Sequence, residues 1–225
     1  STIRSNDTSL NDFKIKINQG NASFRDSLFE VDFGLLFNDS LKPLTLKGFI
    51  PTNRTNNKLD LRLNGDEKFL EFIENLSDQY FTFNNGNANL KMIISGGINK
   101  PIANGFLFIK DANIDILNNN LKELDATFIF DFDQIEIKKF SALGLQNGRI
   151  NLFGSLPFYK ELEDDKKSLK FTSQNFNLVG KNASFDFDSD ISIKGSFAQS
   201  KISGNLGLKN GFVNFKLQNK KNTGN

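Results

Sequence analysis

Alternation of apolar and polar residues is the feature that most constrains the fold of this 225-residue chain. It is clearest in residues 128–132 (FIFDF), 135–137 (IEI) and 185–188 (FDFD). Successive side chains of a β-strand point to opposite faces, so such strands have one apolar face and one face of Lys, Asp and Asn. Short spacers rich in Gly, Asn and Asp separate the alternating segments, and this favours antiparallel hairpins over βαβ units. The sequence therefore predicts an all-β, antiparallel-rich fold.

The segment from Asp66 to Gln79 departs from this pattern. Its apolar residues follow the helical spacing i, i+3, i+4 and i+7, at Phe69, Phe72, Ile73 and Leu76. Asp66 is a suitable N-cap residue. We predict one short amphipathic helix here.

The composition argues against most kinds of catalysis. The chain has no His and no Cys, which removes the commonest general base, the thiol nucleophile and the usual transition-metal ligands. Only a carboxylate pair or a Lys remains, so we expect no enzyme, no cofactor and no metal site. A net charge of +2, dispersed along the chain, does not favour nucleic-acid binding.

Two motifs occur twice in the same order. Gly96 and Gly195 lie 99 positions apart. Each is followed nine residues later by a second Gly, which begins a hydrophobic strand. Residues 46–51 (LKGFIP) and 152–157 (LFGSLP) form the other pair. This indicates tandem units at 45–150 and 151–217, within one elongated domain that covers 1–225. Roughly 16 to 18 strands would extend the sheet to about 80 Å.

The ordered motifs resemble the TamB (translocation and assembly module) family, part of the AsmA-like group of envelope proteins. The resemblance rests on residues 97–105 (GINKPIANG), 111–114 (DANI), a strand at 127–133 and a closing 148–157 (GRINLFGSLP). The short predicted helix lies where such proteins have one, and the composition would suit a cyanobacterial-type member. The resemblance covers roughly residues 45 to 217 and includes no catalytic motif.

The resemblance implies an elongated sheet that is curled into a trough, or β-taco, with an apolar interior. It implies a periplasmic location and an inner-membrane anchor outside this chain. The implied roles are phospholipid transport between membranes, outer-membrane biogenesis and protein secretion. The implied partners are phospholipid acyl chains and an outer-membrane β-barrel assembly protein of the Omp85 type. Residues 1–11 are polar and do not resemble a signal peptide, and no apolar run is long enough for a transmembrane helix.

We expect one set of apolar side chains to line the interior of the trough: Phe106, Phe108, Phe128, Phe130, Phe132, Ile150, Leu152, Phe185, Phe187, Leu206 and Leu208. Five charged residues should face water: Lys110, Asp131, Asp133, Asp186 and Asp188. Alternate aspartates share a strand face and could bind a cation, but a solvated outer face is the better interpretation.

Three other interpretations fit the alternation. The chain could be a β-sandwich or solenoid binding module of the cell surface, such as an adhesin domain. It could be an outer-membrane barrel, but two Tyr and no Trp do not provide the aromatic girdles of such barrels. An enzyme with paired carboxylates is the least favoured.

Overall fold

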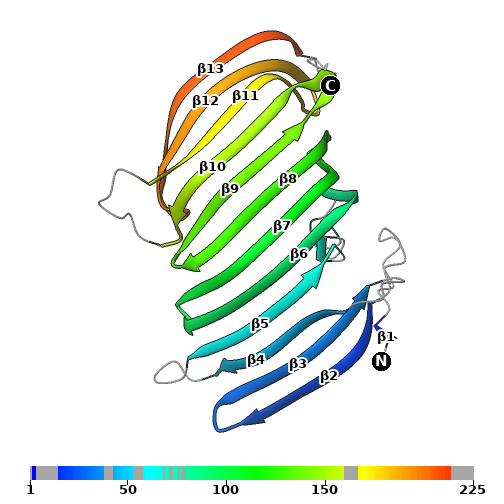
Figure 1. Cartoon of the computed structure of the whole chain (residues 1–225), viewed down its shortest axis with the longest axis vertical. Coiled ribbons are helices and arrows are strands. Elements are labelled where there is room, and N and C mark those ends of the chain that lie inside the picture. The colour runs from blue at the N-terminus through cyan, green and yellow to red at the C-terminus, as the bar shows by residue number, and fades with distance from the viewer. Residues whose placement is uncertain are drawn as a thin grey trace, which may run out of the picture.

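The computed structural model describes residues 2–3, 15–37, 43–52, 58–67, 69–70, 73–74, 77, 80–159 and 167–213, with side chains from residue 20 onward except that of Phe37. All strands in these ranges belong to one sheet, in which each strand pairs antiparallel with its neighbours in the sequence. Figure 1 shows the strands in chain order along the long axis of the molecule. The all-β, antiparallel prediction is confirmed.

The 13 strands are β1 (Thr2–Ile3), β2 (Ile15–Arg25), β3 (Leu28–Phe37), β4 (Leu44–Pro51), β5 (Leu59–Asp66), β6 (Phe81–Gly97), β7 (Lys100–Ile116), β8 (Asn119–Phe132), β9 (Gln134–Leu143), β10 (Arg149–Pro157), β11 (Ser168–Val179), β12 (Ala183–Gly195) and β13 (Ser200–Val213). One 3-10 turn, η1 (Leu145–Asn147), joins β9 to β10. The described ranges hold fewer strands than the 16 to 18 expected, because β6 and β7 each run for 17 residues.

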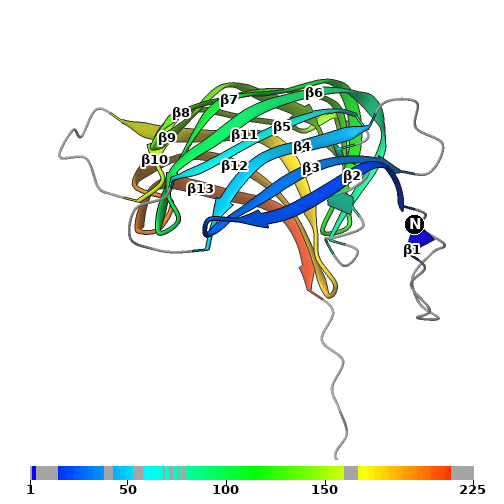
Figure 2. The same ribbon diagram turned by 90° about the horizontal axis from the view of Figure 1, so that it is seen from below.

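The sheet forms a single curled layer. The strands arch over a concave side, which gives the sheet the shape of a trough (Figure 2). A β-sandwich needs two sheets packed face to face, and the described residues form only one. The curled-trough prediction therefore agrees with the structure, and the sandwich alternative does not.

Most of the segment predicted to be a helix lies outside the described residues. Phe69, Leu70, Ile73 and Glu74 have helical backbone, but the described positions do not make up a complete helix. Asp66 is the last residue of β5 and not a helix N-cap. The helix is thus not supported by the structure, although the buried Leu70 shows that the segment packs against the sheet.

Cross-strand register separates the two faces of the sheet. In a single curved layer, side chains are buried mainly by other side chains on the same face, where the curvature brings them together. Along β8, Leu124 and Ala126 are each 1% exposed, and Phe128 contacts a buried cluster of Ile137, Leu156 and Leu169. These residues mark the concave face, because curvature crowds side chains together only on the inside.

Glycines recur on the concave face at every third strand. Gly48 on β4, Gly105 on β7, Gly154 on β10 and Gly204 on β13 have φ values of 139°, 148°, 116° and 143°. At each of them a Cβ atom would lie 1.9 to 2.1 Å from a carbonyl oxygen of an adjacent strand. Only Gly tolerates both the conformation and the close approach, and glycines of this kind mark bends in sheets.

The glycine spacing bears on the repeats seen in the sequence. Gly96 and Gly195 also match in conformation, with φ values of 90° and 91°. Gly48 and Gly154, the pair found in the sequence, are six strands apart, and Gly105 lies midway between them. The structure therefore shows a spacing of three strands. The units proposed at 45–150 and 151–217 stay a prediction.

A candidate hydrophobic groove

An unbroken apolar row crosses the concave face at right angles to the strands. Register places its members directly opposite one another from β5 to β13: Gly65, Leu90, Leu107, Phe128, Ile137, Gly154, Leu169, Ile193 and Ile202. With neighbouring strands about 4.8 Å apart, this row is roughly 40 Å long. No member of the row is polar or charged, but Leu90, Ile137 and Leu169 are buried, so only part of the row is exposed on the concave face.

Nine of the eleven residues predicted to line the interior lie on the concave side. Phe128 and Phe130 pair with Ile137 and Ile135 of β9. The remaining seven are placed by their pairing with β7, β9, β11, β12 or β13: Phe132, Ile150, Leu152, Phe185, Phe187, Leu206 and Leu208.

Phe106 and Phe108 lie on the convex side, so their assignment to the interior is wrong. Phe106 is opposite Ile129, whereas Leu107 is opposite Phe128 on the concave face. Every residue from 106 to 109 is apolar, so alternation within β7 does not specify a face, and only pairing with β8 decides it. The two rings contact each other edge to face at 5.2 Å, and Phe108 is 47% exposed.

Exposure differs along the groove. Ile150 belongs to a buried cluster with Leu124 and Phe176 near one rim, whereas the Phe128 and Phe130 side chains are half-buried. Leu206 and Leu208 on the edge strand are 58% and 61% exposed. Phe132 is 57% exposed, since it ends β8 with a positive φ of 57°. Within the described residues, the groove is thus packed at one rim and more exposed along β13.

Asn119 closes the packed rim, and nothing in the sequence pointed to it. The β9–β10 hairpin is short, and beyond its turn the longer strands β8 and β11 approach each other. The Asn119 side chain is buried, accepts a 2.7 Å hydrogen bond from the Val179 N–H and donates a 3.1 Å hydrogen bond to the Val179 carbonyl. Its side-chain amide therefore joins β8 to β11, which are not neighbours in the sheet, with the kind of paired hydrogen bonds that two backbones would otherwise make.

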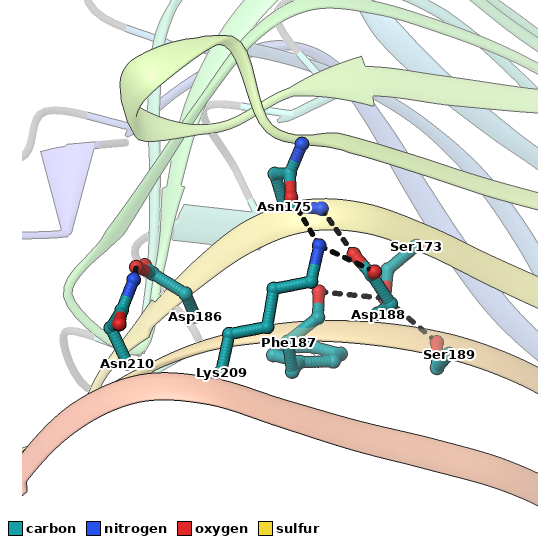
Figure 3. A network of polar contacts seen from close by, with 8 residues as sticks. All are labelled: Ser173, Asn175, Asp186, Phe187, Asp188, Ser189, Lys209 and Asn210. Atoms are coloured by element: carbon teal, nitrogen blue, oxygen red, sulfur yellow. Dashed lines mark hydrogen bonds and ion pairs between the residues drawn. The ribbon is translucent and has the colours of Figure 1, made fainter.

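The concave face also contains a polar pair that the sequence did not indicate. Ser173 on β11 and Ser189 on β12 are buried, lie opposite each other, and share a hydrogen bond of 2.8 Å. In Figure 3 this pair lies beside Phe187, whose carbonyl accepts a further bond from Ser173. Because the hydroxyls satisfy each other, they leave the groove without an unpaired buried polar group at this point.

The convex face is charged, as predicted. Lys110, Asp131 and Asp133 are exposed, and Asp133 lies in the turn between β8 and β9. Asp188 forms an ion pair of 2.7 Å with Lys209 and accepts a 2.6 Å bond from the backbone N–H of Asn175. In Figure 3 this carboxylate and the ring of Phe187 lie on opposite sides of β12. Asp186 likewise accepts a bond from Asn177.

Each of two carboxylates holds a β-bulge in place. Asn175 and Asp111 have φ values of 46° and 51°, and their N–H groups donate to Asp188 and Asp125. The Lys209 hydrogen bond, then that from Asn175, lowers the pKa of Asp188. The hydrogen bond from Lys139, at 2.6 Å, and then that from Asp111 lower the pKa of Asp125 in the same way. These aspartates therefore stabilise the two bulges. Within the described residues, no group of three or more His, Cys, Asp or Glu side chains could hold a metal ion.

No family model, curated protein or solved structure matches this chain. None of the helical residues in the described ranges belongs to a helix long and apolar enough to cross a membrane.

Proposed function

We propose that this chain is a segment of a TamB-like envelope protein whose concave face carries the acyl chains of phospholipids between membranes. The observation that supports this proposal is the apolar row from Gly65 to Ile202, which has no charged member. A hydrocarbon chain offers no hydrogen bonds, so a surface along which it slides must be continuously apolar. By resemblance, the periplasm, an inner-membrane anchor outside this chain and an Omp85-type partner belong to the same proposal.

The dimensions of the row suit this cargo. One leaflet of a bilayer is about 15 Å of hydrocarbon, half of the roughly 30 Å core. The row of roughly 40 Å therefore exceeds the length of one acyl chain. Each buried methylene contributes about 0.8 kcal/mol, so burial of only five would contribute roughly 4 kcal/mol. That is enough for retention without tight capture, as a conduit requires.

The single-layer geometry also supports a conduit. Side chains such as Phe128 and Phe130 lie at the centre of the sheet but are only half-buried, and the described strands form no second sheet that could cover them. A compact protein would bury such rings in full. Half-covered aromatic rings on a concave face leave contact area for a mobile apolar ligand.

Site-specific photo-crosslinking tests the proposal. A benzophenone amino acid at Leu152, on the concave face, is compared with one at Phe153, the adjacent convex residue that is 49% exposed. The protein is incubated with vesicles of phosphatidylethanolamine and phosphatidylglycerol, and lipid adducts are measured by mass spectrometry. We expect adducts from position 152 and few from position 153.

A pair of charge substitutions separates transport from folding. Phe130→Asp places a carboxylate in the groove. Phe106→Asp places one on the convex face of β7, the strand that pairs with β8. Phe130→Asp should remove the lipid adduct at position 152 because a hydrated charge repels hydrocarbon, and Phe106→Asp should leave it. Both variants should keep their β-type circular dichroism, because a half-buried site lets water reach the carboxylate. Equal adducts at both positions, or an adduct that survives Phe130→Asp in a folded protein, would exclude the groove as the lipid path.

A further inference from the structure

A depression on the convex face lies across β4, β5 and β6, which are neighbours in the sheet (Figure 1). Its volume is about 240 Å³. Register places Thr45, Asn64 and Lys91 directly opposite one another on these strands, and Lys91 lies opposite the convex residue Phe106. The depression is therefore on the side of the sheet away from the lipid groove. Five polar side chains contribute to its lining: Thr45, Asn64, Asp66, Asn89 and Lys91.

These five side chains carry no net charge. Asp66 provides one carboxylate and Lys91 one ammonium, and the other three provide two amides and a hydroxyl. The Asn64 amide donates a long hydrogen bond of 3.5 Å to the Thr45 hydroxyl. The Asn89 and Lys91 side chains are exposed and form no hydrogen bond or ion pair with the described part of the chain. Such a set favours a neutral ligand with many donors and acceptors over an anion or a metal cation.

An aromatic pair on β7 adjoins the depression. Phe106 lies opposite Lys91 and Phe108 lies opposite Asn89, and the two rings contact each other edge to face at 5.2 Å. Phe108 is 47% exposed although β7 is a central strand of the sheet. The face of an aromatic ring is negative, and the C–H groups of a sugar ring carry partial positive charge. A sugar can therefore pack its C–H face against such a ring while its hydroxyl groups bond to neighbouring polar side chains.

The size of the depression suits one small ring. Pockets that enclose drug-sized ligands have volumes of roughly 300–1,000 Å³, and about 240 Å³ is below that range. The side chains of Asn64, Asn89 and Lys91 are exposed on a convex sheet, so the depression does not enclose its ligand. Both ends of a chain molecule can therefore leave it, and an internal unit of a polymer can enter as readily as a free sugar.

We propose that this depression binds one saccharide unit of a neutral glycan. The Asn89 amide and the Lys91 ammonium donate hydrogen bonds to hydroxyl or acetamido oxygens, and Asp66 accepts one from a hydroxyl. The ring of Phe108 packs against the C–H face of the sugar. This inference does not depend on lipid transport, because it concerns the opposite face of the sheet and a different set of residues.

Calorimetric titration of the whole chain with two trisaccharides tests the proposal. One is triacetylchitotriose, whose sugar units carry acetamido groups, and the other is cellotriose, whose units carry hydroxyl groups only. We expect a dissociation constant of about 1 mM or below for at least one of them. Binding of the first alone identifies an N-acetylated glycan as the source of the ligand, and binding of both identifies recognition through the hydroxyl groups. Either pattern supports a saccharide site.

Alanine variants locate the site on the sheet. Asn89→Ala and Phe108→Ala should each weaken binding by about tenfold or more, because each removes one of the two kinds of contact. Asn151→Ala and Phe153→Ala are the matched controls, since both residues are exposed and lie on the convex face of β10. Phe153 is 49% exposed, close to the value for Phe108. The controls should change the dissociation constant by less than about twofold, and circular dichroism checks that all four variants are folded.

Three results would overturn the proposal. The first is that neither trisaccharide binds at concentrations up to about 10 mM, tenfold above the expected dissociation constant. The second is that the control variants lose as much affinity as Asn89→Ala and Phe108→Ala, which would place binding elsewhere. The third is that adenosine binds more tightly than both sugars and depends on Phe108, which would assign the depression to a heteroaromatic ligand. None of these results alters the lipid adduct expected at position 152, so the two proposals fail separately.

Discussion

Replacement of Gly105 by Ala tests whether the recurring glycines hold the bend of the sheet. A Cβ atom at this position would lie 2.0 Å from the carbonyl oxygen of Lys91, and the φ of 148° lies in a region that L residues rarely adopt. The conformation costs about 1–3 kcal/mol, and the displacement of packed backbone costs about 1–3 kcal/mol more. The total of about 2–6 kcal/mol is a large part of the 5–15 kcal/mol that typically stabilises a domain.

Gly97→Ala is the matched control. Gly97 is the last residue of β6, which forms a hairpin with β7. A Cβ atom at this position would have no atom within 4 Å. We expect a change below about 0.5 kcal/mol for this variant. Gly204→Ala should cost less than Gly105→Ala, because among the described strands β13 pairs only with β12, whereas β7 pairs on both sides.

Urea unfolding, followed by far-UV circular dichroism, measures these differences as shifts in midpoint at constant slope. The glycine interpretation predicts the order Gly105→Ala, then Gly204→Ala, then Gly97→Ala, from most to least destabilised. If Gly105→Ala and Gly97→Ala unfold at the same urea concentration, the close approach of β7 to β6 does not require glycine and the reasoning is refuted.

Two further predictions concern the rim and the bulges. Asn119→Leu removes both hydrogen bonds to Val179 and leaves partly buried backbone groups unpaired, so it should destabilise the protein by about 1–3 kcal/mol. Hydrogen exchange of the Val179 amide should accelerate, and unchanged protection there would contradict the role of Asn119 in joining β8 to β11. The pKa of Asp125 is lowered in the folded state, so its contribution to stability is present above its unfolded pKa of about 3.9 and is lost as the pH falls through the folded value. Lys139→Met should therefore flatten the dependence of the unfolding midpoint on pH between about 5 and 2, and an unaltered profile would show that the ion pair contributes nothing.

The sequence by itself determined the face of every strand in which polar and apolar residues alternate. Phe128 and Phe130 precede Asp131, and Phe185 and Phe187 alternate with aspartates, so these rings could only lie opposite the charged face. The same local period of two specified the all-β class, because hairpins between adjacent strands need no information from distant residues.

Tertiary structure decided what the local pattern left open. In β7, four consecutive apolar residues satisfy either face, and pairing with β8 turned Phe106 outward. The clamp at Asn119 depends on β8 meeting β11 beyond a short hairpin, which joins residues 60 positions apart. The glycines can be found in the sequence, but their common role follows from their position on every third strand of the sheet. Local alternation specifies which side of a strand is apolar, whereas curvature and closure depend on contacts between strands, and these exist only once the sheet has formed.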